Sequence, residues 1–124
     1  MRPLVLLIVA CLLPGCGQKT VKSISFHEQI QPILKSQCVK CHGTEIARGK
    51  IVLTTYESMM NSRTAKGKKP LVVAQEPAKS WLYIVCATNQ PHYRMPPDTS
   101  TVVALTKEQL QLLSKWIEGG AKEN

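Results

Sequence analysis

The sequence predicts an all-α domain whose helices are joined by long loops. Apolar residues recur at helical spacing near both ends of the globular part, and each of these segments follows a residue that can cap a helix. No segment of useful length alternates apolar and polar residues as a half-buried strand does. The length of 124 residues allows a single domain, and a hydrophobic content of 44% excludes a chain that is disordered by composition.

The first expected helix covers Phe26 to about Gln37. Ser25 and Glu28 have the spacing of a capping box, in which the side chain of each residue accepts a hydrogen bond from the backbone N–H of the other. Pro32 lies inside the segment, so it should kink the helix or move its start later. The apolar face consists of Phe26, Ile30, Ile33 and Leu34.

The middle of the chain predicts short helices and constrained loops. A short helix is expected from Tyr56 to Asn61, and Pro77 can start another because proline suits the first helical position. Lys66 to Pro70 is expected to be a loop. Asn89 to Ser100 holds three prolines and is expected to be a loop with little freedom.

The C-terminal helix has the clearest signals. Thr106 and Gln109 form a second capping box, and Leu105 and Leu110 have the positions of a hydrophobic staple. Gly119-Gly120 follows and ends the helix. Its apolar face consists of Leu110, Leu113, Trp116 and Ile117.

The first 24 residues are expected to lie outside the fold. The uncharged apolar run Leu4 to Leu13 is too short to span a bilayer and has the length of a signal-peptide core. Leu13-Pro14-Gly15-Cys16 resembles a bacterial lipobox, which implies cleavage before Cys16 and its lipidation; an ordinary cleaved signal and an anchor helix are the alternatives. We expect a signal peptide (1–15), a tether (16–24) and a domain (25–122), exported to the periplasmic or cell-surface side of a membrane.

Cys38-Val39-Lys40-Cys41-His42 is a C-x-x-C-H sequence, the pattern by which c-type haem is attached. The two thiols add to the vinyl groups on one porphyrin edge, and the adjacent imidazole can serve as the proximal iron ligand. Three alternatives are weaker. A zinc site needs further ligands, a thioredoxin-like dithiol needs a βαβ context, and a Cys38–Cys41 disulfide gives no reason for His42.

The ligand on the other side of the iron must come from elsewhere, and the best candidate is Met95. It precedes Pro96, which favours extended backbone geometry. The prolines of this loop leave the thioether little entropy to lose on binding. The alternatives are that Met95 fills a gap in the core, or that His92 is the ligand and lowers the potential relative to a thioether.

Together these residues resemble the class I cytochrome c fold and, more narrowly, the planctomycete-type cytochrome c domain, over about residues 24 to 122. The resemblance implies one covalent haem c, thioethers at Cys38 and Cys41, and axial His42 and Met95. It also implies three to five helices with long loops around the haem, the first and last of which cross beside it. Many class I cytochromes orient the proximal imidazole with the carbonyl of a nearby proline. Residues 43–53 contain no proline, so the partner of His42 is not predicted.

The leading function is that of an electron carrier in the cell envelope, cycling between Fe(II) and Fe(III), with no catalytic residue. The alternatives are a haem-based sensor or peroxidase-like enzyme from which Met95 dissociates, and a thiol oxidoreductase that uses Cys38 and Cys41. Aromatic residues make up only 5% of the chain, so haem would supply much of its apolar bulk. We therefore expect the chain without haem to be largely unfolded.

Sixteen basic and eight acidic residues give a formal net charge of +8. Arg63, Lys66, Lys68 and Lys69 lie in one loop, which either steers an acidic redox partner into a small transient interface or is simply solvated. Nucleic acid is not an expected partner of an exported protein, and the membrane is reached through the lipid anchor. Cys86 is expected to be a buried small hydrophobe; an intermolecular disulfide and a redox role are the alternatives.

Overall fold

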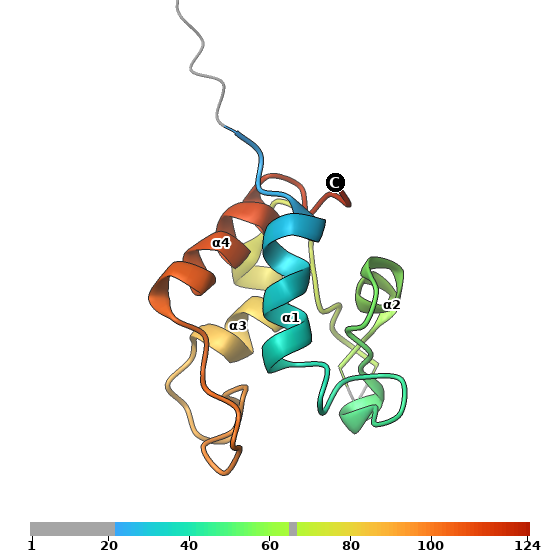
Figure 1. The fold of residues 1–124 in the computed structure, drawn as a ribbon, viewed down its shortest axis with the longest axis vertical. Coiled ribbons are helices and arrows are strands. Elements are labelled where there is room, and N and C mark those ends of the chain that lie inside the picture. Colours follow the sequence, from blue (N-terminus) through green and yellow to red (C-terminus); the bar gives the residue numbers. More distant parts are fainter. Residues whose placement is uncertain (1–21, 65–66) are drawn as a thin grey trace, which may run out of the picture.

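The computed structural model describes residues 22–64 and 67–124, which form four α-helices, short helical turns and long loops, with no strand in these ranges. The helices are α1 (Gln31–Gln37), α2 (Tyr56–Asn61), α3 (Trp81–Ala87) and α4 (Lys107–Glu118) (Figure 1). The all-α prediction is confirmed. Among the described residues, none of the helices combines the length and the hydrophobicity that a transmembrane span requires. The predicted signal peptide, lipobox and Cys16 lie outside the described residues, as does Lys66.

The first helix begins at Phe26, as predicted, but has two geometries. Phe26–Ile30 is a π-helical turn, and the α-helix follows with Pro32 in its first turn, where the missing N–H of proline costs no hydrogen bond. Pro32 therefore moves the start of the α-helix later, which is one of the two effects that the sequence predicts. The predicted capping box is present in part: the Ser25 side chain accepts from the Glu28 N–H at 3.2 Å, but the Ser25 N–H donates to the side chain of Gln29 at 3.0 Å, not to that of Glu28. The wider turn accounts for this shift by one residue.

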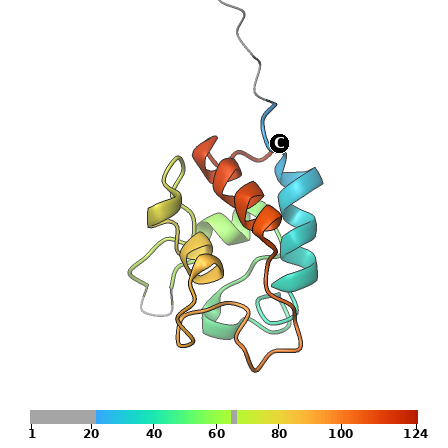
Figure 2. The same cartoon turned by 90° about the vertical axis from the view of Figure 1, so that its left-hand side faces the viewer.

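Helix α4 crosses the N-terminal turn of the first helix (Figure 2). Its predicted capping box is present, with both reciprocal bonds between Thr106 and Gln109. The Phe26 and Trp116 rings pack with centroids 5.6 Å apart, so the crossing expected from the resemblance is confirmed. The buried core consists of Phe26, Ile30, Leu34, Leu53, Met59, Leu71, Val72, Leu82, Leu113, Trp116, Ile117 and Ala121.

The last residues of the chain return to the start of the first helix. The backbone oxygen of Asn124 accepts from the His27 N–H at 3.1 Å and from the Ser25 hydroxyl at 2.7 Å, and its side-chain oxygen accepts from the Phe26 N–H at 3.0 Å. These contacts satisfy backbone donors that a helix start otherwise leaves open. Residues 22–25 and the C-terminus therefore lie together at one end of the molecule (Figure 1).

Helix α2 has the predicted bounds, but Pro77 does not start α3. Pro77–Lys79 forms a separate 3-10 turn, and α3 begins only at Trp81. The reason is Ser80, which is fully buried with an extended backbone. Its hydroxyl accepts from the Val73 N–H at 2.9 Å and lies 3.0 Å from the Glu76 carbonyl, to which it can donate. These bonds hold Ser80 between two helical segments. Residues 89–100 form a loop, as predicted.

Candidate functional site

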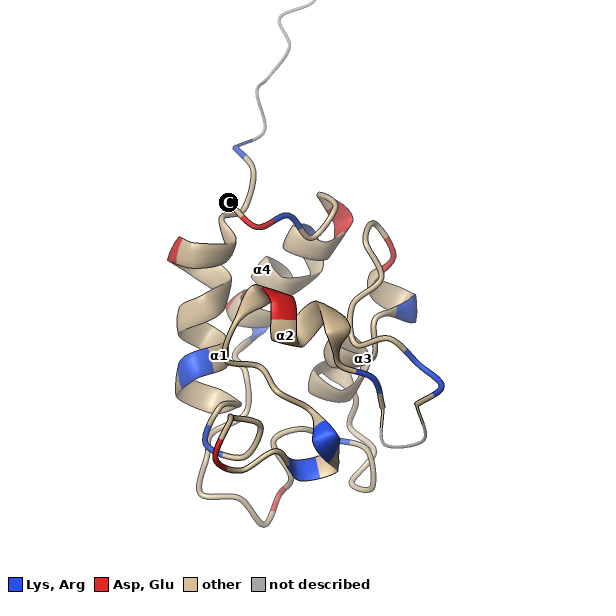
Figure 3. Cartoon of the chain, turned by 90° about the vertical axis from the view of Figure 1, so that its right-hand side faces the viewer, with Lys and Arg blue, Asp and Glu red and all other residues tan. Residues whose placement is uncertain are grey.

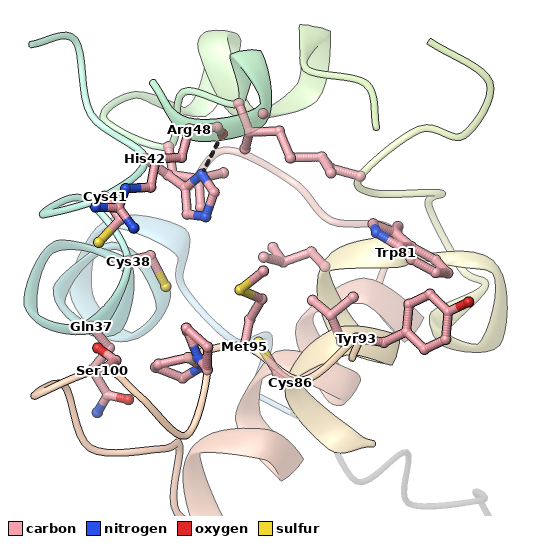
Figure 4. A pocket seen from close by; sticks show the side chains of 18 of the residues that line it. Gln37, Cys38, Cys41, His42, Arg48, Trp81, Cys86, Tyr93, Met95 and Ser100 are labelled. Atoms are coloured by element: carbon pink, nitrogen blue, oxygen red, sulfur yellow. Dashed lines mark hydrogen bonds between the residues drawn. The ribbon is translucent and has the colours of Figure 1, made fainter. Parts of the chain in front are cut away.

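A largely apolar cavity of about 330 Å³ lies beside the C-terminal end of α1 (Figure 4). The loops that line it are at the end of the molecule opposite residues 22–25 (Figure 1). The cavity volume falls within the range of small-molecule sites, about 300–1,000 Å³. Four segments provide most of its wall: the C-terminal end of α1 with the turn after it, residues 48–53, α3, and residues 92–102. The predicted residues Cys38, Cys41, His42 and Met95 all line this cavity.

Both predicted attachment cysteines lie on the same wall (Figure 4). Helix α1 ends at Cys38, and the N–H groups of Cys41 and His42 both donate to the Cys38 carbonyl, at 3.0 and 2.9 Å. This tight turn brings the two thiols to one edge of the cavity, and both are free. Burial, together with the neighbouring Cys41, raises the pKa of the Cys38 thiol to about 11.

The His42 imidazole is fixed by a backbone hydrogen bond. Its Nδ1–H donates to the Arg48 carbonyl at 3.0 Å, which leaves Nε2 directed into the cavity (Figure 4). Burial lowers the pKa of His42 and outweighs the bonds to backbone carbonyls, which raise it. A neutral ring with one nitrogen bonded and the other open is the form in which histidine binds metals.

The Arg48 carbonyl thus orients the imidazole. In many class I cytochromes a proline carbonyl does this, but residues 43–53 contain no proline. Arg48 begins a short 3-10 turn, Arg48–Lys50, in which Gly49 and Lys50 have left-handed φ angles of 67° and 60°. Sequence reasoning missed Arg48 because a backbone carbonyl leaves no mark on its own residue type. The signal that could have found it is Gly49, since glycine is the residue that adopts such a conformation most readily.

Met95 reaches the cavity from the wall opposite His42, and its side chain points toward the imidazole (Figure 4). Its N–H donates to the Val85 carbonyl at 2.8 Å, so the loop is attached to α3 beside the cavity. Arg94 and Asp98 form an ion pair at 3.0 Å that closes the loop. Met95 is 39% exposed, and His92 also lines the cavity. Met59 lies in the core instead.

Comparison with known proteins places this site in a family. A family model described as planctomycete cytochrome C matches residues 38–99. The chain belongs to this family. The match begins at Cys38, the first residue of the C-x-x-C-H pattern, and extends past Met95. The protein is therefore a haem-binding cytochrome, and its family implies covalently bound haem c. No curated protein and no solved structure matches the chain.

The residues around the cavity fit this group. A haem needs an apolar slot, thiols at one edge and an axial donor on at least one face. The cavity of the cytochrome offers a largely apolar lining, two thiols on one wall, an imidazole nitrogen from one side and a thioether from the other. Within residues 22–64 and 67–124, no three His, Cys, Asp or Glu side chains lie close enough together to hold a metal ion by themselves.

An aromatic wall lies across the cavity from the cysteines (Figure 4). The rings of Trp81 and Tyr93 meet edge to face with centroids 6.2 Å apart, and the Lys69 ammonium lies 4.6 Å from the Trp81 ring centroid. Cys86 also lines the cavity as a free thiol. It is partly rather than fully buried, so the prediction of a buried residue is correct only in part. Burial, with a smaller effect of Cys38, raises its pKa to about 12.

Proposed function

We propose that this cytochrome is a single-haem electron carrier, with thioether bonds at Cys38 and Cys41 and axial ligands His42 and Met95. The observation that supports this most is that His42 and Met95 point toward one another across an apolar cavity that has both thiols on one wall. When bound, the haem supplies an Fe(II)/Fe(III) couple for one-electron transfer. No catalytic residue is required for this function.

The residues of the chain would bind, orient and shield the haem. Cys38 and Cys41 fix one edge, and His42 and Met95 fill both axial positions, which keeps other ligands out. The apolar wall excludes water and, together with the thioether, raises the reduction potential. The hydrogen bonds from His42 to Arg48 and from Met95 to Val85 attach the imidazole ring and the base of the Met95 side chain to the fold, so few groups need to rearrange when the charge on iron changes.

The distribution of charge supports an acidic redox partner that docks at the cavity end. The described parts of three loops that surround the cavity, residues 38–50, 61–70 and 89–104, carry seven basic and two acidic residues. The remaining described residues carry six of each, so the net positive charge of this part of the chain lies around the cavity. Figure 3 shows Lys and Arg gathered around this end and most Asp and Glu toward the other. Such a field steers a negatively charged partner toward the cavity mouth.

The apolar surface supports the same docking face. The exposed large hydrophobic residues of the described part are Ile46, Tyr93, Met95 and Val103, and all four lie on the same cavity loops. An apolar centre with a charged rim is the usual composition of a protein interface, and transient redox complexes use small ones. We therefore assign the partner to this face.

We further propose that the domain is a lipoprotein, anchored through Cys16 on the periplasmic or cell-surface side of a membrane. The support is the lipobox-like sequence, together with the end of the molecule at which the tether joins. Residues 22–25 lie at the end opposite the cavity, so the docking face would point away from the membrane (Figure 1). A labelled lipid precursor should be incorporated into the full-length chain and not into a Cys16→Ala variant.

A second candidate function is that of a haem-based sensor or peroxidase-like enzyme. It is favoured by the 39% exposure of Met95 and by the position of His92 on the same cavity, which would allow the thioether to leave. The rate at which the reduced protein binds carbon monoxide distinguishes the two functions. An electron carrier with permanent ligands should bind it slowly in the reduced state, whereas rapid binding would favour the sensor.

The main proposal is tested by producing the full chain in a host with haem-ligation machinery. The protein should be coloured, retain haem on a denaturing gel and show the mass of one attached haem. Its spectrum should change reversibly with the uptake of a single electron in a redox titration. A colourless product with the mass of the bare chain would contradict the proposal.

A further inference from the structure

We propose that Gln37 and Ser100 are positioning residues that together hold the loop carrying Met95 against the end of α1. The inference rests on the proposed function, in which Met95 is an axial ligand. The hydrogen bond that we assign to the haem-bound protein runs from the Ser100 hydroxyl, as donor, to the side-chain oxygen of Gln37. Neither residue belongs to the attachment motif or to the proposed ligands.

The loop that carries Met95 is fixed at one side only. The Met95 N–H donates to the Val85 carbonyl at 2.8 Å, which attaches the first half of the loop to α3. In the described structure, the hydrogen bonds of residues 96–104 all have their partners within residues 94–104. The second half of the loop therefore passes the cavity without a hydrogen bond to α1 or α4.

Gln37, the last residue of α1, has an amide whose orientation is fixed. Its Nε2 donates to the Gln109 Oε1 at 3.2 Å, and that oxygen also accepts from the Thr106 N–H at 2.9 Å. The Gln37 amide cannot be turned round, because two oxygens would then face each other. Its Oε1 must therefore find a donor other than Gln109.

The Gln37 Oε1 has no such donor in the structure. It is the one buried side-chain nitrogen or oxygen of the described residues that makes no hydrogen bond. Buried polar atoms without a partner are rare in folded proteins, because water no longer solvates them and nothing replaces it. A donor that reaches this oxygen would therefore stabilise the protein.

The Ser100 hydroxyl is a donor without an acceptor. Its Oγ accepts from the Val102 N–H at 3.0 Å, and its own proton has no acceptor among the described residues. Ser100 and Gln37 both line the cavity, and their side chains lie at the same edge of it (Figure 4). A movement of residues 96–104 toward α1 would pair the two groups and fix the second half of the loop.

The bond should determine how long Met95 stays in place. Met95 is 39% exposed, and its side chain is flexible, so its position depends on the loop that carries it. A loop held on both sides opens less often. The bond should therefore slow the replacement of the thioether by an external ligand, by about threefold to tenfold for a hydrogen bond of ordinary strength.

The test measures how fast saturating imidazole replaces Met95 in the oxidised full chain with haem attached. The loss of the optical signature of sulfur ligation gives the rate. Gln37→Leu removes the acceptor, and Ser100→Ala removes the donor. Ser100→Thr keeps the hydroxyl, and Thr101→Ala is the matched control because it removes an exposed hydroxyl of the same loop that does not line the cavity.

Each single substitution also removes a second hydrogen bond, so a double variant is needed. Gln37→Leu loses the bond to Gln109, and Ser100→Ala loses the bond from Val102. A double-mutant cycle separates these losses from the bond between the two side chains. In protein with isotope-labelled glutamine, the chemical shift of the Gln37 side-chain carbonyl carbon reports that bond directly.

We expect Gln37→Leu and Ser100→Ala each to speed the replacement by about threefold to tenfold. The double variant should be hardly faster than the faster of the two, because the shared bond is lost only once. Ser100→Thr and Thr101→Ala should react at the parent rate. Ser100→Ala should shift the Gln37 carbonyl resonance, whereas Thr101→Ala should not.

Single variants that react at the parent rate would overturn the positioning role alone. So would a double variant whose acceleration equals the product of the two single effects. If Gln37→Leu did not fold, the Gln37 resonance in Ser100→Ala would decide, and an unchanged resonance would overturn the bond. A parent protein without attached haem, or without the signature of sulfur ligation, would overturn this inference together with the proposed function.

Discussion

At the scale of single residues, the two side chains proposed as axial ligands are each held by one backbone hydrogen bond. The His42 ring donates to the Arg48 carbonyl at 3.0 Å, and the Met95 N–H donates to the Val85 carbonyl at 2.8 Å. The first bond orients a ring and the second fixes the base of a flexible side chain. The imidazole is therefore placed more rigidly than the thioether, so Met95 is the ligand whose identity most needs a test.

Replacement of Met95 by alanine should abolish the optical signature of sulfur ligation in the oxidised protein. It should also lower the midpoint potential, because a thioether favours Fe(II) more than the ligands that could replace it. Haem should stay attached, since Cys38 and Cys41 are unchanged. Absorption spectra and a redox titration measure both effects.

The matched control for this prediction is His92→Ala, because His92 lines the same cavity three residues away. It should leave the sulfur signature and the potential unchanged. If His92→Ala removed the normal spectrum and Met95→Ala did not, the imidazole would be the ligand.

The sequence could single out four residues for the site because their chemistry resides in their side chains. The spacing of Cys38, Cys41 and His42 and the proline after Met95 predicted four residues that the structure brings to one cavity. Arg48 could not be predicted in the same way. It acts through its carbonyl, which every residue possesses, and only the backbone around Gly49 directs that carbonyl to the ring.

At the scale of secondary structure, local signals predicted most helices, and buried hydrogen bonds account for the main difference. Thr106 and Gln109 predicted the start of α4 because both partners of a capping box are adjacent in sequence. The start of α3 was predicted at Pro77 and lies at Trp81. The hydrogen bond between Ser80 and Val73 keeps the helix from starting at Pro77. Sequence periodicity does not reveal this contact, because it crosses a loop.

Replacement of Ser80 by alanine should destabilise the protein by about 1–3 kcal/mol, because the Val73 N–H loses its acceptor in a site that excludes water. Chemical denaturation of the haem-containing protein followed by circular dichroism measures this loss. Ser36→Ala on the exposed face of α1 is the control and should change stability by less than about 0.5 kcal/mol. Equal effects of the two substitutions would show that the Ser80 bonds contribute little.

At the scale of the whole molecule, residues 22–25 and the loops that line the cavity lie at opposite ends of the fold. Residues 22–25 and the C-terminal segment meet at one end, where Asn124 bonds to the first helix, and loops that line the cavity lie at the other. Net charge follows the same division, because the basic excess of the described residues lies on the cavity loops. This uneven distribution of charge predicts that the rate of electron transfer depends on the charge of the oxidant.

Oxidation of the reduced protein by a small anionic iron complex should slow as salt rises, whereas oxidation by a cationic cobalt complex should quicken. Replacing Lys68 and Lys69 by glutamine should slow oxidation by the anionic complex a few fold at low salt. This is a small part of the roughly 10–10³-fold by which a charged cleft can raise an association rate. Lys115→Gln with Lys122→Gln removes the same charge away from the cavity loops and should have a smaller effect. Stopped-flow rates that respond equally to both pairs would exclude local steering.

The cavity also determines how the chain should behave before haem is attached. The aromatic cluster of Phe26, Tyr56 and Trp116 packs at the end near the chain termini, whereas the cavity end has Trp81 and Tyr93 around an open space. An apolar cavity of about 330 Å³ left unfilled deprives its lining of packing contacts and exposes apolar side chains to water, which lowers the stability of the haem-free chain. The chain with Cys38→Ala and Cys41→Ala, made without haem, should therefore lose most of its helical circular dichroism and show no cooperative thermal transition. Met59→Ala in the haem-bound protein removes a fully buried side chain from the core and should keep a cooperative transition at a lower temperature. A native-like spectrum of the haem-free chain would mean that the helices and the aromatic cluster are sufficient to fold the domain.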